Sequence, residues 1–511
     1  MKRLISLLLL LAMLSSVLLL AGCPSNDPGT GGGGGGGTGE KTFLDNLGDR
    51  NYNGDTFTVA SGDKFAYEVY AEEDTTDILE EAVYKRNRAL EDRFNVKIEH
   101  DKQINDTENN AMIPYFQGAY NSGDGIFDIA MVYVYRAGAL VTDAMCYDQR
   151  EWVPYVMDAL NNGSEWWSKD INDAFTVQGH QYASVSDYCI TAISLTYAMV
   201  FNKQIDDNDN ISTGLNYESM YDIVHKGDWT IDLFRTIVKD RFEDVKENDT
   251  HDAKEDKFGF VTCGSTAIDQ FAAAFNINYI NNNGELTPEL LTFSDRVVSA
   301  YDALYDLFHG PGKGTVIAGE GGTWSVDMIS AFTEGRAFIV TMPLMRLSED
   351  AVHEMDDDYG ILPYPKLTES QSQYYSGTVD NYSVICIPAY HPLERIDMVG
   401  TMIEALSAET HNSVEEPYYD LIVTHNSTRD EASIPMIEII MNGRLYDFAT
   451  LHYSRLNYDH PTTGVSEGLG LLFRNALVAH ETQDIKSVWD AISDQVQLRL
   501  DDLIADYVDM Y

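Results

Sequence analysis

The feature that most constrains the fold is an alternation of short apolar segments with a helical pattern between residues 56 and 134. Residues 56–60 and 96–98 have the composition of β-strands, and residues 78–94 between them repeat apolar side chains with the period of an amphipathic helix. Residues 128–134 (DIAMVYV) are apolar enough for a strand that is covered on both faces. This order predicts an open, mostly parallel α/β sheet, whose ligands bind at the carboxyl ends of the strands.

Later segments predict how the chain continues. Residues 181–203 are predicted to form one long extended stretch, and residues 206–214 a polar, solvated loop. Residues 186–197 and 359–365 are extended enough to serve as strands that cross between lobes. The residues after Pro392 have mostly helical patterns.

The N-terminus is organised as a secretory signal. Two basic residues precede an almost wholly apolar run over residues 5–20. Leu20-Ala21-Gly22-Cys23 resembles the lipobox of bacterial lipoproteins, which implies that residues 1–22 are removed and that Cys23 carries the lipid that anchors the protein on the extracytoplasmic face of a membrane. Residues 23–41 include seven consecutive glycines and have the composition of a flexible tether. An ordinary cleaved signal with an incidental cysteine is the alternative.

Length, charge and cysteine spacing narrow the class of protein. A chain of 511 residues is too long for one ordinary domain and predicts two or three lobes. Its formal net charge of −48 repels nucleic acid and anionic lipid, so no nucleic-acid partner is expected. Beyond Cys23, the cysteines are widely spaced and form no C-x-x-C pair: Cys146, Cys189, Cys263 and Cys386. No zinc site and no cofactor are predicted, and disulfide pairing stays open.

Several short motifs follow one another in a recognisable order. They are residues 198–203 (AMVFNK), 228–230 (DWT), 332–338 (FTEGRAF), 359–365 (YGILPYP) and a strand that ends at Ile387-Pro388. Their order and spacing resemble those of the family 1 extracellular solute-binding lipoproteins of ABC importers, most of which serve sugars. The resemblance covers nearly the whole chain after residue 56.

The resemblance implies an α/β fold of the type II periplasmic-binding-protein kind, a clamshell of two hinge-connected lobes. It places residues 42–190 and 362–390 in lobe 1, and residues 191–361 and 391–511 in lobe 2. It further implies a monomeric receptor, not an enzyme, that captures a small solute by lobe closure and delivers it to a membrane permease. Among solutes, the resemblance and the 31 tyrosines favour a carbohydrate.

Candidate ligand contacts follow from the chemistry of sugars. Aromatic faces pack on C–H faces, while carboxylates, amides and arginine bond the hydroxyl groups. Side chains of these kinds, in loops at predicted strand ends or hinges, are Phe65, Tyr67, Tyr133, Tyr135, Arg136, Asp187, Tyr188, Trp324, Tyr375, Asp380 and Asn381. Arg136 is a lone base at the end of a buried strand. Many sugar binders of the family carry a tryptophan where this chain has Met342-Pro343-Leu344-Met345, so the ligand class stays open.

Two other functions stay in view: a lipid-anchored glycoside-processing enzyme, and a binding lipoprotein for sensing or adhesion. Residues 464–468 match the G-x-S-x-G nucleophile motif, but the polar residues before them do not predict the buried strand that this motif requires. No spacing singles out the carboxylate pair of a glycosidase. Residues 206–210 (DDNDN) are not followed by the glycine and glutamate of an EF-hand loop, so no calcium site is predicted.

Overall fold

The computed structural model describes residues 43–64, 66–103, 111–153, 164–282, 287–318, 325–418, 431–462 and 464–509. The chain divides into two compact units, Met1–Asn46 and Leu47–Tyr511. In the first unit the described element is helix α2 (Phe43–Asn46). The second unit contains the two large sheets and all the sites discussed below. Every described helix is too short or too polar to cross a lipid bilayer.

The first sheet has five strands in the order β2-β1-β3-β13-β4. They are β1 (Asp55–Gly62), β2 (Val96–Gln103), β3 (Ile129–Tyr133), β4 (Ala183–Ser184) and β13 (Ser383–Cys386). Strand β1 runs parallel to β2 and β3, whereas β13 runs antiparallel to β3 and β4. Strand β3 is buried along its whole length, as its sequence predicts.

Helix α3 (Ile78–Phe94) connects β1 to β2 and has the predicted bounds. Its start is fixed by Asp77, whose carboxylate accepts hydrogen bonds from the N–H groups of Leu79 and Glu80 at 2.9 and 3.0 Å. Its end is fixed by Asn95, which adopts the left-handed conformation with φ of 46°. The amphipathic pattern between these caps is sufficient to define the helix, because it buries one face against the sheet.

The second sheet has the order β10-β7-β11-β5-β12. Its strands are β5 (Tyr197–Asn202), β7 (Lys257–Cys263), β10 (Thr315–Ala318), β11 (Ala337–Pro343) and β12 (Tyr359–Leu362), with β6 (Phe242–Glu243) paired to the start of β7. The helices that pack on its strands are α14 (Ile231–Val238), α15 (Thr266–Ala274), α16 (Asp295–His309) and α17 (Val326–Thr333). The start of α14 is fixed by Thr230, whose Oγ1 accepts a hydrogen bond from the N–H of Leu233 at 3.4 Å.

The chain passes between the two sheets along segments that hydrogen-bond to one another. We call residues 195–197, 376–379 and 443–445 the crossing segments. The N–H of Tyr197 donates to the carbonyl of Gly377 at 2.9 Å, and the N–H of Leu445 donates to the carbonyl of Ser376 at 2.9 Å. The crossing segments therefore form a small ladder that joins the two sheets.

Four sequence predictions about secondary structure and strand direction are wrong. Residues 181–203 are not one extended stretch, and residues 186–197 are not a crossing strand, because helix α10 (Ile190–Ser194) interrupts them. The β-branched residues there favour a strand locally, but burial of the whole helix overrides that preference. Residues 206–214 lie in helices α11 (Lys203–Asp209) and α12 (Ile211–Gly214) rather than in a loop. Both sheets are mixed rather than mostly parallel.

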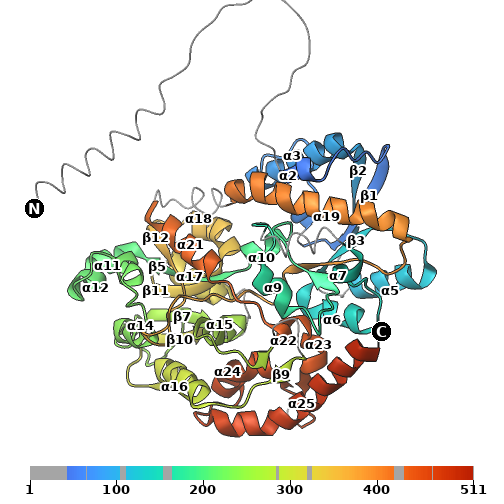
Figure 1. The fold of residues 1–511 in the computed structure, drawn as a ribbon. Helices are drawn as coiled ribbons and strands as arrows, with labels where there is room; N and C mark the ends of the chain where they lie inside the picture. The colour runs from blue at the N-terminus through green and yellow to red at the C-terminus, as the bar shows by residue number, and fades with distance from the viewer. Residues whose placement is uncertain are drawn as a thin grey trace, which may run out of the picture. The chain divides into compact units, whose positions relative to one another are not determined.

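The C-terminal part is helical, as predicted, and its helices distribute over both sheets (Figure 1). They are α19 (Leu393–Ser413), α21 (Ile434–Asn442), α22 (Phe448–Leu451), α23 (Tyr453–Leu456), α24 (Leu472–Arg474) and α25 (Ile485–Asp509). Helix α19 packs on α3, and α22 and α23 pack on α6 (Val134–Thr142), beside the first sheet. Helix α21 packs on β12, and α24 packs on α15, beside the second sheet. The lobe boundaries at residues 190, 361 and 390 stay predictions, and these contacts favour grouping α19 with the first sheet.

Candidate ligand-binding site

An aromatic group with a guanidinium follows strand β3. Helix α6 begins directly after β3, so Tyr133, Tyr135 and Arg136 lie at the carboxyl end of a central strand. The rings of Tyr133 and Tyr135 stack with centroids 6.2 Å apart and an angle of 8° between their planes. The Arg136 guanidinium lies 4.8 Å from the centroid of the Tyr135 ring. The edge of this group contacts Tyr453, whose ring is 6.3 Å from that of Tyr135.

A charged pair lies at the corresponding end of the second sheet. Asp269 is in α15, which follows β7, and Arg474 ends α24. Arg474 Nη2 is 3.1 Å from Asp269 Oδ2. Burial raises the pKa of Asp269 to about 7, against the opposing effect of Arg474, and the carboxylate of Asp380 raises it further. Burial also raises the pKa of Asp380, and Arg474 opposes that shift too. The Arg474 guanidinium therefore favours the charged form of two buried carboxyl groups, those of Asp269 and Asp380.

Polar atoms of this group lack partners. Asp269 Oδ1, Arg474 Nε and Asn381 Oδ1 are all buried, and none of them has a hydrogen-bond partner among the described residues. Buried polar groups in folded proteins are nearly always hydrogen-bonded, because an unmet group keeps its full desolvation cost. An unmet acceptor on Asp269 and an unmet donor on Arg474, which lie side by side, match a ligand with several hydroxyl groups.

A cavity of about 160 Å³ adjoins the pair. Its wall includes Asp269 and Gln270 of α15, Thr378 of a crossing segment, and Tyr446 and Asp447 just after another. The crossing segment approaches α15 so closely that a Cβ at Gly377 would lie 1.9 Å from Gln270 Oε1. The cavity is therefore built from residues beside the passage between the sheets.

Tyr67 reaches the same passage from the first sheet. It lies in η1 (Ala66–Glu68) after β1, and its hydroxyl is 3.3 Å from Ser194 Oγ at the end of α10. A second cavity, of about 190 Å³, is lined by Tyr67 and by Met345 and Ser348, which follow strand β11 of the second sheet. Met345 belongs to the stretch where the family resemblance would place a tryptophan. Burial raises the pKa of the Tyr67 hydroxyl above its ordinary value, so the group stays a neutral donor.

The buried carboxylate of Glu68 holds Tyr67 in place. It is 1% exposed and accepts hydrogen bonds from the N–H and the hydroxyl of Thr191, both at 3.0 Å, and from the hydroxyl of Ser383. The guanidinium of Arg86 donates to the Glu68 carbonyl at 3.0 Å. Burial raises the pKa of Glu68 to about 7, against the effect of these bonds.

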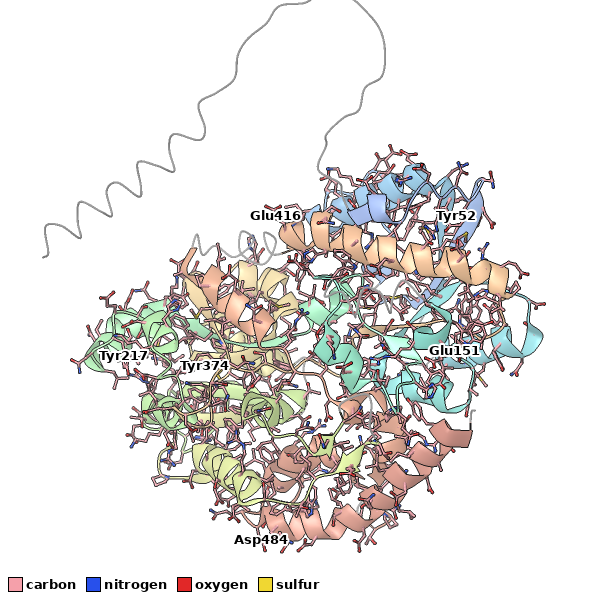
Figure 2. The ribbon with its side chains drawn as sticks, in the orientation of Figure 1. Tyr52, Glu151, Tyr217, Tyr374, Glu416 and Asp484 are labelled. Carbon is pink, nitrogen blue, oxygen red and sulfur yellow. The ribbon has the colours of Figure 1, made fainter. Side chains whose placement is uncertain are left out.

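Other predicted contacts lie elsewhere. Tyr188 is fully buried beneath the Arg86 guanidinium, which is 4.9 Å from its ring centroid. Asp187 pairs with His411 at 2.9 Å. Tyr375 is half-buried next to Tyr374, which is labelled in Figure 2 and donates from its hydroxyl to the carbonyl of Val224. Cys23, Phe65 and Trp324 lie outside the described residues.

Sequence reasoning missed Asp269, Tyr453 and Arg474. Asp269 lies in the first turn of the helix that follows strand β7, so the strand-end rule could have found it. Tyr453 and Arg474 come from C-terminal helices whose pattern indicates packing alone. The G-x-S-x-G match is confirmed as incidental, because Ser466 lies in β15 (Ser466–Glu467), which pairs only with the short strand β14 (Tyr458–Asp459). The strand that precedes the motif, β14, is two residues long and partly exposed, unlike the buried strand that a nucleophile elbow requires.

Comparisons with known proteins identify the fold. No protein-family model matches the chain, and no curated protein matches it. A solute-binding protein of an ABC transporter from Thermotoga lettingae, bound with α-D-tagatose, aligns at a TM-score of 0.50 and 12% identity, over 87% of this chain and 100% of its own. The GacH receptor of Streptomyces glaucescens aligns at 0.49 and 11%, over 86% and 99%. A solute-binding protein from Agrobacterium radiobacter, in complex with ribitol, aligns at 0.47 and 13%, over 90% and 100%. By the match to the T. lettingae protein, the fold is the two-lobed α/β clamshell of ABC-transporter solute-binding proteins.

Proposed function

We propose that this protein is a lipid-anchored, extracytoplasmic receptor that captures a carbohydrate between its two sheets and delivers it to the permease of an ABC importer. The observation that carries the proposal is the incomplete Asp269–Arg474 pair, whose two charges act on Tyr453, and the ring of Tyr453 contacts the stacked Tyr135. The clamshell fold supports it, since the T. lettingae protein of the same fold was solved with a ketose sugar.

The chemistry of the site suits sugar hydroxyls. A hydroxyl group both donates and accepts, so it can donate to Asp269 Oδ1 while another accepts from Arg474 Nε. Tyr133 and Tyr135 supply aromatic surface for the C–H face of a sugar ring. The two carboxylates near one guanidinium disfavour an anionic solute.

Capture follows from the placement of these groups on both sheets. Tyr135 belongs with the first sheet, and Asp269 with the second. A ligand that contacts both binds the closed arrangement more tightly than the open one, and so shifts the population towards closure. The permease then distinguishes loaded from empty receptor by that arrangement.

Calorimetric titration of the mature chain, with Cys23→Ser to keep it soluble, tests the binding function. The panel contains mono-, di- and trisaccharides and sugar alcohols, with amino acids and short peptides as the other arm. We expect binding of one sugar class, with the ligand recovered unchanged and the binding lost in Arg474→Gln. Arg235→Gln is the matched control, because Arg235 forms a comparable ion pair with Asp306 at 2.8 Å away from the crossing segments. Consumption of the sugar would favour the glycoside-processing enzyme, and binding of peptides alone would overturn the carbohydrate class.

Membrane fractionation of the expressed full chain tests the anchor. We expect the wild-type protein in the membrane fraction and the Cys23→Ala variant outside it, because acyl chains insert with about 0.8 kcal/mol per buried CH₂. Mass spectrometry of the N-terminal peptide should find acyl groups on Cys23. Equal release of both proteins into the soluble fraction would instead indicate an ordinary cleaved signal.

A further inference from the structure

A second polar cluster lies where α19 meets the chain segment that leads into α10. We call Asp187, His411 and Glu415 the histidine–carboxylate cluster. His411 Nδ1 is 2.9 Å from Asp187 Oδ2 and 3.3 Å from Glu415 Oε2. One ligand atom from each of the three residues lies within 4.8 Å of the other two. The other ring nitrogen, Nε2, is 3.5 Å from Glu165 Oε2.

The cluster has more hydrogen-bond acceptors at Nδ1 of His411 than that nitrogen has protons to donate. A ring nitrogen carries one proton and donates it to one acceptor, yet two carboxylates face Nδ1 of His411. A simpler arrangement is seen at His480, whose Nε2 lies 3.1 Å from Glu467 Oε1. If a cation occupied the centre, the nitrogen lone pair and both carboxylate oxygens would bind it together, and no acceptor would be in excess.

The residues around the cluster hold its members in place. The Glu404 carboxylate, two turns before His411 in α19, accepts from the indole N–H groups of Trp166 and Trp167 at 2.9 and 2.7 Å. Ser407, one turn before His411, bonds Ser186 at 2.7 Å between their hydroxyl oxygens. The N–H of Asp187 donates to the carbonyl of Trp166 at 3.1 Å. These bonds hold α19 in a fixed position against the segments around Trp166 and Ser186, as a preorganised site requires.

We propose that Asp187, His411 and Glu415 bind a divalent transition-metal ion, with Zn²⁺ as the class that fits best. An imidazole nitrogen and two carboxylate oxygens make three protein ligands, and water completes four-coordination. Imidazole favours Zn²⁺ over the oxygen-seeking Ca²⁺ and Mg²⁺. Glu165 Oε2 lies 3.5 Å from Nε2, where its carboxylate would accept from Nε2–H and orient the ring once the ion is bound. The side chains are 28%, 13% and 16% exposed for His411, Asp187 and Glu415, so an ion can reach them.

This site is independent of the sugar-binding proposal. Its ligands come from α19, the helical residues that follow it and the segment before α10, whereas the candidate sugar contacts follow β3 and β7. A bound ion would tie the C-terminal end of α19 to the chain just before α10. It would thus join two parts of the protein that are distant in sequence.

Titration of the mature protein, stripped of metal with a chelator, against ZnCl₂ tests the proposal. We expect one tightly bound equivalent in the wild type. His480→Gln, the matched control, should bind as the wild type does. Because outer partners of metal ligands typically contribute 10–100-fold in affinity, Glu165→Gln should weaken binding by about tenfold, and His411→Gln and Asp187→Asn by about 100-fold or more. X-ray absorption should find nitrogen and oxygen at about 2.0–2.2 Å and no sulfur.

Two results would overturn the proposal. The first is equal zinc affinity in the wild type and in His411→Gln, with the variant folded by circular dichroism. The second is a sulfur-containing zinc shell, which would assign the ion to the cysteines. Should His411→Gln fail to fold, Glu415→Gln decides the matter by the same titration, because it removes one ligand and leaves the His411–Asp187 bond intact.

Discussion

Two buried carboxylates, Glu68 and Asp269, lie beside the passage between the sheets and differ in how completely they are bonded. Both have a pKa raised to about 7 by burial. Both oxygens of Glu68 accept hydrogen bonds, from Thr191 and Ser383. Asp269 offers one oxygen to Arg474, and its other oxygen has no partner among the described residues.

The difference separates a structural role for Glu68 from the binding role that we propose for Asp269. The partners of Glu68 come from α10 and β13, so this carboxylate joins the turn after β1 to two segments that lie far from it in the sequence. Its bonding is complete without a ligand. Asp269 keeps the desolvation cost of an unmet oxygen, which a folded chain retains where a ligand supplies the missing bond. Substitutions of Glu68, Asp269 and Tyr135 test these two roles.

The largest effect is expected on stability in Glu68→Ala. The change removes the acceptor for three donors, the N–H and hydroxyl of Thr191 and the hydroxyl of Ser383, and it removes a carboxylate whose charge favours the buried Arg86 guanidinium. Removing one member of such a group costs about 3–5 kcal/mol. Urea unfolding monitored by circular dichroism should show this loss, while Glu416→Ala, an exposed control labelled in Figure 2, stays within about 0.5 kcal/mol of the wild type. A loss of unfolding free energy below about 1 kcal/mol in Glu68→Ala would contradict a structural role for Glu68.

A somewhat smaller effect is expected in the pH dependence of stability. The folded protein holds the Glu68 proton more tightly than the unfolded chain does, since the pKa rises from 4.5 to about 7. The stability that this group contributes is therefore full below pH 4.5 and is lost as the pH rises through about 7. Relative to Glu68→Gln, which cannot titrate, the wild type should lose about 3 kcal/mol over that range. Parallel stability curves for the two proteins between pH 4.5 and 7.5 would contradict the burial of an ionisable Glu68.

Asp269→Asn should weaken sugar binding rather than folding. A hydrogen bond to a charged group contributes about 1.5–3 kcal/mol, so the affinity should fall by about 10- to 150-fold. The unfolding free energy should stay equal or rise, because the variant removes a buried charge whose bonding is incomplete. Calorimetric titration and urea unfolding on the same preparation measure both quantities. A loss of stability as large as that of Glu68→Ala would assign Asp269 a structural role as well.

The smallest effect is expected from the aromatic pair. Tyr135→Leu removes the ring that stacks on Tyr133 and contacts Tyr453. Such contacts contribute about 0.5–1.5 kcal/mol beyond burial, so sugar affinity should fall by about two- to twelvefold. Tyr217→Leu, on a ring labelled in Figure 2 that packs beneath Lys226, is the control and should leave the affinity unchanged. Equal affinities in both variants would place the ligand away from the stacked tyrosines.

Much of the fold follows from local patterns in the sequence. Helix α3 has the predicted bounds because its apolar period, the Asp77 cap and the Asn95 terminus agree. Helix α10 is missed because its residues favour a strand locally, while the bonds of Thr191 to Glu68 and Ser383 stabilise a helix there. Those partners are more than a hundred residues distant along the chain, so no local pattern could indicate them.

The candidate site likewise contains residues that the sequence predicts and residues that it does not. The strand-end rule places Tyr133, Tyr135 and Arg136 together, because all three follow one buried strand. The Asp269–Arg474 pair joins a helix after β7 to a C-terminal helix, and neither residue carries a signal of the other in the sequence. Asp187 has the predicted chemistry of a ligand residue, but α19 brings His411 to it instead of the sugar site.

The position of β13 has a consequence for the order in which the protein can be assembled. Strand β13 lies between β3 and β4, although residues 197–362, which contain the strands of the second sheet, precede it in the chain. A chain that is synthesised from its N-terminus therefore contains all the strands of the second sheet before it contains β13, which completes the first sheet. No single cut can yield two fragments that each hold one entire sheet, whereas excision of the middle of the chain would remove the second sheet as an insert. Synthesis and secretion must then leave β3 and β4 unjoined until residue 383 arrives, which makes this interval the stage most exposed to misfolding and proteolysis.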